Sequence, residues 1–155
     1  MKHIVGFLFF LISKIPLMAQ VTDSLPKFDP SRNPFEDLKI AIEQAEQTNK
    51  NIILDVGGEW CIWCHRIDAF MHNNKEIKNL LDENYIVVKI NFSKENKNEE
   101  FLSQYPKIEG YPHFFVLDRT GKLLHSQNTG DLEEGKDYDK VKFIDFLKKW
   151  KTNKI

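Results

Sequence analysis

Two cysteines constrain the fold of this chain more than any other feature. Cys61 and Cys64 are the only cysteines among its 155 residues, and they stand three positions apart. An apolar run from residue 52 to residue 56, broken only by Asp55, precedes them, and two glycines follow that run. A helical pattern then begins at the cysteines. A strand, a glycine-rich turn and a Cys-x-x-Cys pair at a helix start are typical of a redox-active site.

The spacing of the cysteines predicts a pair that cycles between dithiol and disulfide. Residues three apart on a helix share a face, with Cβ atoms about 5–6 Å apart, so a small local adjustment permits an S–S bond. At a helix N-terminus, the first backbone N–H groups and the helix dipole stabilise an anion. We therefore expect Cys61 to be the attacking, thiolate-like sulfur and Cys64 to be the more buried, resolving one.

Length and charge indicate one soluble domain. A chain of 155 residues is long enough for a single domain with a real core. The formal net charge is −1, and no block of basic residues is present. We therefore expect no nucleic-acid partner.

The first 19 residues differ from the rest of the chain. Lys2 and His3 precede a short apolar run, and Ala19 offers a cleavage site. The run is too short to span a bilayer, so residues 1–19 are predicted to be a secretory signal peptide, with an uncleaved N-terminal anchor as the alternative. Residues 20–32 are polar and contain two prolines, which predicts an exposed lead-in. The protein is thus expected to be exported, to the periplasm or another extracytoplasmic compartment.

Export raises the alternative of a purely structural disulfide. A bridge between residues three apart closes a very small loop. Because the stabilisation by a disulfide grows with the length of the loop it closes, this bridge would stabilise the fold little. A redox role is therefore the better interpretation of the pair.

Hydrophobic periodicity predicts alternating helices and strands. The last helix is expected to align Tyr138, Val141, Ile144, Leu147 and Trp150 on one face. Within the long helical stretch after the cysteines, Asn73 and Glu76 predict a restart through a capping box. The predicted helices are 34–49, the two after the cysteines, 93–104 and 138–151; the predicted strands are 52–56, 85–92, 113–117 and 122–126.

This order of elements predicts an α/β fold. Strands that alternate with helices imply a central, mostly parallel sheet with helices on both faces. The last two strands, joined by a short turn, add an antiparallel C-terminal hairpin. The strand at 52–56 is apolar at nearly every position, which favours a place in the middle of that sheet.

At four places the chain resembles the thioredoxin superfamily. Trp60-Cys61-Ile62-Trp63-Cys64 is similar to the Trp-Cys-x-x-Cys active site of that family. Asp55 matches its buried acid, and Lys89 matches the lysine beside that acid. Gly110-Tyr111-Pro112 is similar to the family's Gly-x-Pro, in which the proline is cis. The resemblance covers about residues 34–150 and includes exported bacterial proteins, such as the soluble C-terminal domain of the periplasmic transmembrane thiol reductase.

The resemblance implies a thioredoxin fold for residues 33–155 and an activity for the cysteine pair. The activity is thiol–disulfide exchange with exported protein substrates, with no metal or organic cofactor. Reduction is preferred over oxidation, and an exported reductase would need a membrane thiol reductase as electron donor. Burial on an apolar strand would raise the pKa of Asp55, which makes it the expected proton acceptor for Cys64, and Lys89 is expected to tune it. The residues expected to contact substrate are Trp60, an exposed Trp63, Tyr111 and cis-Pro112.

Three other functions remain compatible with the same residues. Cys61 to His65 also matches Cys-x-x-Cys-His, the attachment signature of a c-type haem electron carrier. The cysteines with His65 and His72 offer four metal ligands, although one helix wraps a single ion poorly. A redox-inert binding module is the third alternative.

Ile62-Trp63 stands where reductases of the family carry Gly-Pro, so the direction of electron transfer stays open.

Overall fold

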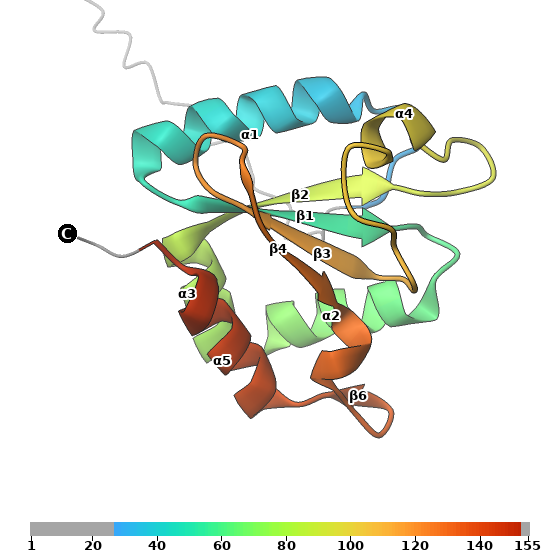
Figure 1. The fold of residues 1–155 in the computed structure, drawn as a ribbon. Helices are drawn as coiled ribbons and strands as arrows, with labels where there is room; N and C mark the ends of the chain where they lie inside the picture. Colours follow the sequence, from blue (N-terminus) through green and yellow to red (C-terminus); the bar gives the residue numbers. More distant parts are fainter. Residues whose placement is uncertain (1–26, 153–155) are drawn as a thin grey trace, which may run out of the picture.

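The computed structural model describes residues 27–152. The predicted signal peptide and most of the predicted lead-in lie outside these residues. A four-stranded sheet separates two helical layers, with α1 (Pro34–Thr48) on one face and α2 (Ile62–Asn73), α3 (Lys75–Asn84) and α5 (Lys140–Trp150) on the other (Figure 1). Helices on both faces were predicted, and this is confirmed. Between residues 27 and 152, no helix is both long and apolar enough to cross a membrane.

The remaining elements are short. The four strands of the central sheet are β1 (Asn51–Gly57), β2 (Tyr85–Asn91), β3 (His113–Leu117) and β4 (Leu123–Asn128). A single-turn helix, α4 (Glu99–Leu102), follows β2. Between β4 and α5 lie a 3₁₀ turn, η1 (Thr129–Leu132), and a small hairpin of β5 (Glu133–Glu134) and β6 (Asp137–Tyr138), and β6 lies against α2.

The central position predicted for β1 is confirmed. Every residue of β1 is buried, because β2 and β3 pair with it and helices cover both of its faces. Successive side chains of a strand point to opposite faces. Ile52, Leu54 and Val56 therefore join the hydrophobic cluster under α1. Ile53 joins the cluster under α2, α3 and α5, and Asp55 faces the same way, toward α2.

The prediction of a mostly parallel sheet is wrong in the direction of one strand. The strand order is β2-β1-β3-β4, and β1 is parallel to β2 but antiparallel to β3. Parallel neighbours need a connection that returns along the whole sheet. The segment between β2 and β3 contains only the four-residue α4. The chain therefore re-enters the sheet at the same end of the strands at which β2 stops, and β3 runs back antiparallel to β1. Consequently His113 lies opposite Val56, and Pro112 lies at the edge that carries the cysteines.

The polar helix predicted over residues 93–104 is wrong except for α4. Three asparagines hold this segment in turns instead: the Asn91 side-chain amide donates to the carbonyl of Asn96 at 2.7 Å, and that of Asn98 donates to the carbonyl of Asn91 at 2.7 Å. Asn98 also adopts a left-handed conformation, with φ of 50°. Asparagine side chains compete in this way with helical hydrogen bonds.

Two details of the predicted helices also differ. The N-cap of α3 is Asn74 rather than Asn73, and its side chain donates to the carbonyl of Phe70 at 2.8 Å, so the predicted capping box is wrong. In α5, Ile144 and Leu147 of the predicted apolar face are buried, whereas Val141 is 68% exposed and Tyr138 precedes the helix, which starts at Lys140. Its buried residues are Phe143, Ile144, Phe146 and Leu147.

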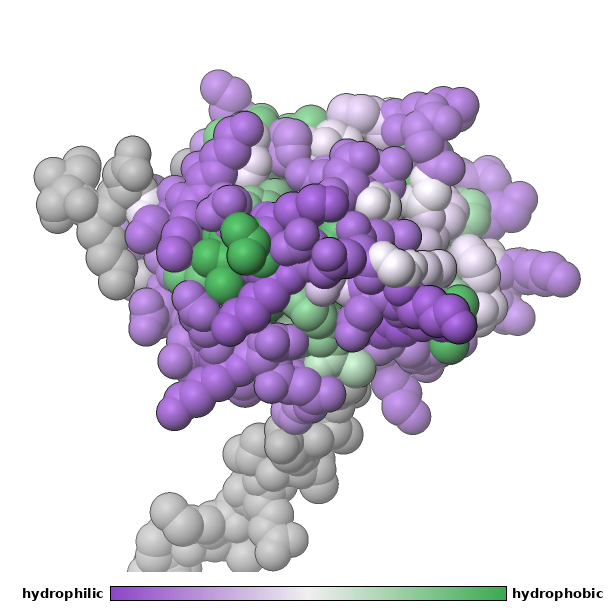
Figure 2. Space-filling view, turned by 90° about the horizontal axis from the view of Figure 1, so that it is seen from below, coloured by the Kyte–Doolittle hydropathy of each residue, from purple (hydrophilic) through white to green (hydrophobic). Residues whose placement is uncertain are grey.

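The side of the molecule seen from below is mainly hydrophilic (Figure 2).

Candidate active site

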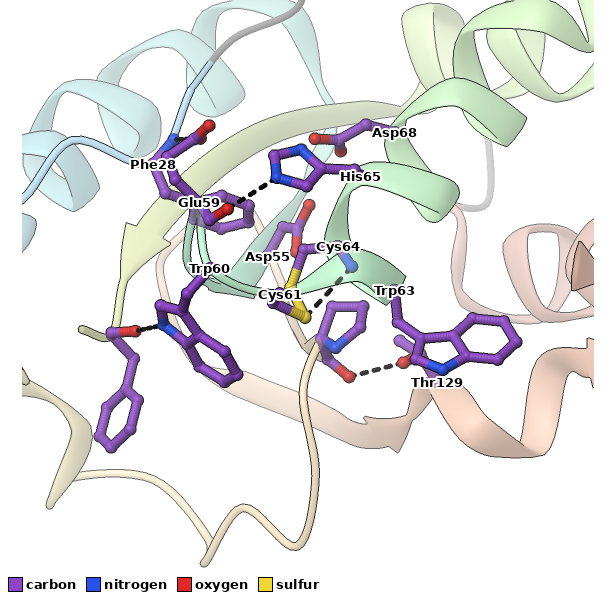
Figure 3. The surroundings of a disulfide bond; sticks show 12 residues. Phe28, Asp55, Glu59, Trp60, Cys61, Trp63, Cys64, His65, Asp68 and Thr129 are labelled. Carbon is purple, nitrogen blue, oxygen red and sulfur yellow. Dashed lines mark hydrogen bonds between the residues drawn. A yellow bond between two sulfur atoms is a disulfide. The ribbon is translucent and has the colours of Figure 1, made fainter. Parts of the chain in front are cut away.

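Cys61 caps the N-terminus of α2. Its backbone is extended, with φ of −96°, and its Sγ accepts a hydrogen bond from the backbone N–H of Cys64 at 3.2 Å (Figure 3). The two residues are joined by a disulfide, and their Cα atoms are 5.2 Å apart. Cys64 is fully buried and Cys61 is 5% exposed, in the predicted order. Once the pair is reduced, the N–H of Cys64 and the helix dipole stabilise a thiolate on Cys61.

The two glycines before the cysteines allow the turn to pack closely. A Cβ atom on Gly57 would lie 2.5 Å from the Sγ of Cys64. On Gly58 it would lie 2.4 Å from the Nε1 of Trp60 and 2.8 Å from the carbonyl oxygen of Phe92. Distances this short exclude a side chain at either position without movement of the site.

A buried cluster of three charged side chains comes from β1, β2 and α2, the helix that begins at the disulfide. Asp55 and Lys89 are paired positions on β1 and β2, and the Lys89 Nζ donates to Asp55 Oδ2 at 2.6 Å. The same ammonium group also binds Asp68, on α2. Asp55 is completely buried, and the side chains of Lys89 and Asp68 are 6% and 10% exposed. Within the described part of the chain, the second carboxylate oxygen of Asp55, Oδ1, is buried and has no hydrogen-bond partner.

Burial dominates the electrostatics of this cluster. It raises the pKa of Asp55, and the charge of Lys89 opposes that shift only in part. Burial, followed by the charge of Asp55, raises the pKa of Asp68 to about 6. Burial lowers the pKa of Lys89, but the two carboxylates outweigh it and hold that pKa above its ordinary value. The cluster can therefore exchange a proton near neutral pH.

An aromatic surface borders the disulfide on one side. Trp60 is 59% exposed, and its Nε1 donates to the carbonyl of Phe92 at 2.7 Å. Its ring meets Tyr111 edge to face at 5.8 Å, and Tyr111 stacks on Phe92 at 4.7 Å. Tyr111 also packs against the buried cluster formed by the two cysteines and Phe28. The Tyr111–Pro112 peptide is cis, as predicted, and the carbonyl of Pro112 accepts a hydrogen bond from the Thr129 hydroxyl.

Comparison with known families identifies this arrangement. A family model described as thioredoxin-like matches residues 33–119. The chain belongs to this thioredoxin-like family. The match covers the cysteine pair, both residues of the Asp55–Lys89 ion pair, and Pro112.

Two curated proteins share part of this sequence, and one of them is named for disulfide chemistry. The disulfide bond reductase DsbH of Chlamydia pneumoniae is 29% identical over 99 residues, which are 58% of this chain and 59% of that protein. Spermatogenesis-associated protein 20 of Mus musculus is 42% identical over 50 residues, 6% of its length. The thioredoxin-like chain thus spans less than two thirds of these relatives.

Solved structures share the fold. A disulphide isomerase from Xylella fastidiosa Temecula1 superimposes with a TM-score of 0.69 at 25% identity, over 83% of this chain and 98% of the other. The oxidised C-terminal domain of DsbD from Neisseria meningitidis gives 0.55 at 22% identity, over 76% and 96% of the two chains.

Trp63 differs from its prediction in this thioredoxin-like site. It was expected to be exposed, but it is half-buried between Tyr138, at 5.7 Å between ring centroids, and the guanidinium of Arg66, 4.5 Å from its ring. Tyr138 comes from the small hairpin after β4, and the local sequence around Trp63 does not predict that contact. Ile62, which is 60% exposed, presents its side chain to solvent instead.

Two site residues were missed in the sequence. Asp68 follows Cys64 by four positions, so it shares that face of α2; this spacing was the available signal. Phe28 was placed in an exposed lead-in, but it is 2% exposed and packs against both cysteines, so that prediction is wrong at this residue. No periodic pattern surrounds Phe28, and only the fold brings it to the site.

The geometry disfavours the haem and metal alternatives. Covalent haem attachment needs both sulfurs at the surface, whereas Cys64 is fully buried and bonded to Cys61. His65 is exposed, and its Nε2 lies 2.8 Å from the carbonyl oxygen of Glu59. Among residues 27–152, no three His, Cys, Asp or Glu side chains gather in a way that could hold a metal ion.

Proposed function

We propose that this thioredoxin-like protein is a thiol–disulfide oxidoreductase that reduces disulfides in exported proteins. The observation that carries the proposal is the Cys61–Cys64 disulfide at the start of α2, with the Cys64 N–H directed at the Sγ of Cys61. An arrangement of this kind stabilises the attacking thiolate and keeps the second thiol in reach of the first.

The reaction follows from the positions of the two sulfurs. The thiolate of Cys61 attacks one sulfur of a substrate disulfide; a mixed disulfide forms, and the other substrate sulfur leaves as a thiolate. Cys64 then gives its proton to Asp55 and attacks the Sγ of Cys61. This step forms the Cys61–Cys64 bond and releases the second substrate thiolate, so the cysteine pair supplies both electrons.

Asp55 suits the role of proton acceptor for two reasons. It is buried on the face of β1 that points toward α2, and its Oδ1 is the oxygen that no described group occupies. Its raised pKa makes its carboxylate a stronger base than an exposed aspartate would be. Lys89 holds the other oxygen and fixes the orientation of the carboxyl group.

The reducing direction needs a source of electrons outside the cytoplasm. We propose that residues 1–19 act as a signal peptide, that residues 33–155 form the exported domain, and that a membrane thiol reductase returns electrons to the oxidised pair. The relative named as a disulfide bond reductase supports this direction.

Substrate would bind over the aromatic surface beside the disulfide. We propose that Trp60, Tyr111 and Pro112 contact the substrate chain, because Trp60 is exposed and Tyr111 packs against both Trp60 and the cluster that contains the cysteines. Trp63 is half-buried by Tyr138 and Arg66, and we propose that its exposed part also contacts the substrate.

Reduction of insulin disulfides by the reduced protein tests the proposal. Wild-type protein should reduce insulin, Cys61→Ala should not, and Cys64→Ala should accumulate mixed disulfides. If Cys61→Ser retained the biological activity of the wild type, the redox-inert binding module would be the better explanation. The reduction potential settles the direction: about −270 mV supports a reductase and about −120 mV a disulfide donor.

A further inference from the structure

Phe28 closes the buried side of the disulfide. It precedes α1 and is 2% exposed, in a cluster with Cys61 and Cys64. A Cβ atom built on Gly57 would meet the Sγ of Cys64 at 2.5 Å and the ring tip of Phe28 at 3.0 Å, so Cys64 and Phe28 both lie against Gly57.

The same ring covers the charged cluster. The Nζ of Lys89 lies 4.3 Å from the centroid of the Phe28 ring, on its face. This ammonium group is the one that binds Asp55 and Asp68. The ring thus touches the cation that orders both carboxylates, and it separates them from solvent with a surface that offers no hydrogen bond.

A backbone contact holds Phe28 in place. Its N–H donates to the Oε1 of Glu59 at 2.8 Å, and Glu59 belongs to the turn that leads into Cys61. The carbonyl of Glu59 in turn lies 2.8 Å from the Nε2 of His65. The segment before α1 is therefore bound to the active-site turn, and not only packed against it.

We propose that Phe28 is a positioning residue for the resolving step, whose ring keeps water away from Lys89, Asp55 and Cys64. This inference rests on the proposed function. In the resolving step, the Cys64 thiol passes its proton to Asp55 and attacks Cys61, and the substrate thiolate leaves. Water at the cluster would hydrate the Asp55 carboxylate and weaken it as a base. The first attack by Cys61 does not use this proton transfer, so Phe28 should affect one step and spare the other.

A substrate with two distinguishable halves separates the two steps. The probe is a fluorescent peptide whose cysteine is disulfide-bonded to thionitrobenzoate, mixed with excess reduced protein. Attack by Cys61 on the peptide sulfur releases coloured thionitrobenzoate, and attack by Cys64 then releases the peptide. Phe28→Ala should slow peptide release about tenfold, which is less than the roughly 100-fold or more that a general base itself contributes, because the base is weakened and not removed. It should leave thionitrobenzoate release within about twofold.

The pH dependence gives a second readout. The rate of peptide release should rise with pH through the pKa of Asp55, and in Phe28→Ala that midpoint should move to lower pH, because hydration favours the charged carboxylate. The titratable groups facing Asp55 are Lys89 on β2, Asp68 on α2 and Tyr138 on β6, with His65 acting on Asp68. All of them stay unchanged in the variant, so the shift reports the loss of the ring.

Matched variants separate this role from packing. Phe28→Leu keeps an apolar cover and should restore most of the resolving rate. Phe35→Ala removes an aromatic ring that is 40% exposed and contacts Phe101, and it should change neither step. If Phe28→Ala does not fold, Phe28→Val carries the same test. Equal slowing of both steps, or of neither, would overturn the proposal, whereas failure of wild-type protein to release thionitrobenzoate would instead reject the proposed function.

Discussion

Asp55 and Asp68 bind the same ammonium group, that of Lys89, from two different elements of the fold. One carboxylate comes from β1 and the other from α2, so Lys89 joins the sheet to the helix that carries the cysteines. Two carboxylates with one cation leave a net negative charge in a site that is nearly closed to water. Such a site holds its protons more tightly than a surface carboxylate does.

Replacing Lys89 with methionine should destabilise the protein strongly at neutral pH. Removing one partner from a buried ion pair leaves an uncompensated charge and costs about 3–5 kcal/mol. The loss should be smaller at pH 4, because burial raises the pKa of both acids, so a larger share of each is neutral than at pH 7 and less charge is left without a partner. Urea unfolding at both pH values measures it. Lys107→Met removes an exposed pair with Glu109, so a change of under about 0.5 kcal/mol is expected there; equal losses in the two variants would contradict the buried cluster.

Asp68 should make wild-type stability fall as pH rises from about 4 to about 7. Its pKa is raised to about 6 in the folded protein, so the folded state binds more protons than the unfolded state in this range. Its contribution is therefore fully present below its ordinary pKa and is lost as pH passes about 6. Burial lowers the pKa of His113 to about 4, which makes stability rise with pH over part of the same range, but this contribution is common to both proteins. Relative to wild type, Asp68→Asn should therefore gain stability as pH rises through about 6. Unfolding free energies measured at several pH values test this, and parallel curves for the two proteins would reject it.

The two tryptophans beside the cysteines should respond differently to truncation. Trp60 is 59% exposed, so Trp60→Ala should cost under about 1 kcal/mol of stability. It should raise KM for a peptide disulfide about tenfold, which corresponds to about 1.4 kcal/mol of lost contact. Trp63→Ala should cost about 2 kcal/mol, because its packing on Tyr138 and Arg66 is lost. Thermal unfolding and steady-state kinetics of both variants test these expectations. A larger loss of stability in Trp60→Ala than in Trp63→Ala would show that the exposure of the two tryptophans is wrongly assigned.

The parts of the site that were predictable depend on local sequence. The start of α2 and the buried strand β1 follow from a few neighbouring residues. The cis peptide before Pro112 was predicted from the family resemblance alone. Asp55 could be singled out because an acid inside an apolar strand is conspicuous. Asp68 shares the face of α2 that carries Cys64, but this spacing alone assigned it no role, because an acid on an amphipathic helix usually faces water.

The remaining errors arise where distant segments meet. The direction of β3 depends on the route of the chain after β2, which the asparagine-rich turns determine and periodicity does not describe. Phe28 lies in a polar segment, and its burial depends on the space left beside Gly57. Trp63 is covered by Tyr138 from a hairpin far along the chain. In each case tertiary contacts, rather than local preference, decide the outcome.

Gly57 and Gly110 offer a direct test of how closely the site is packed. Gly57→Ala places a methyl group 2.5 Å from the Sγ of Cys64 and 3.0 Å from the ring of Phe28, so either the turn or α2 must move. Overpacking of this kind costs about 1–3 kcal/mol. It should also change the rate at which the reduced cysteines form their disulfide, because the added methyl group pushes the Sγ of Cys64 out of its position. At Gly110 the added methyl group meets no atom within 4 Å, so Gly110→Ala should leave both quantities nearly unchanged. Urea unfolding of the oxidised proteins and the rate of disulfide formation in the reduced proteins measure the two effects. Equal behaviour of the two variants would mean that Phe28 and Cys64 do not enclose Gly57 in solution.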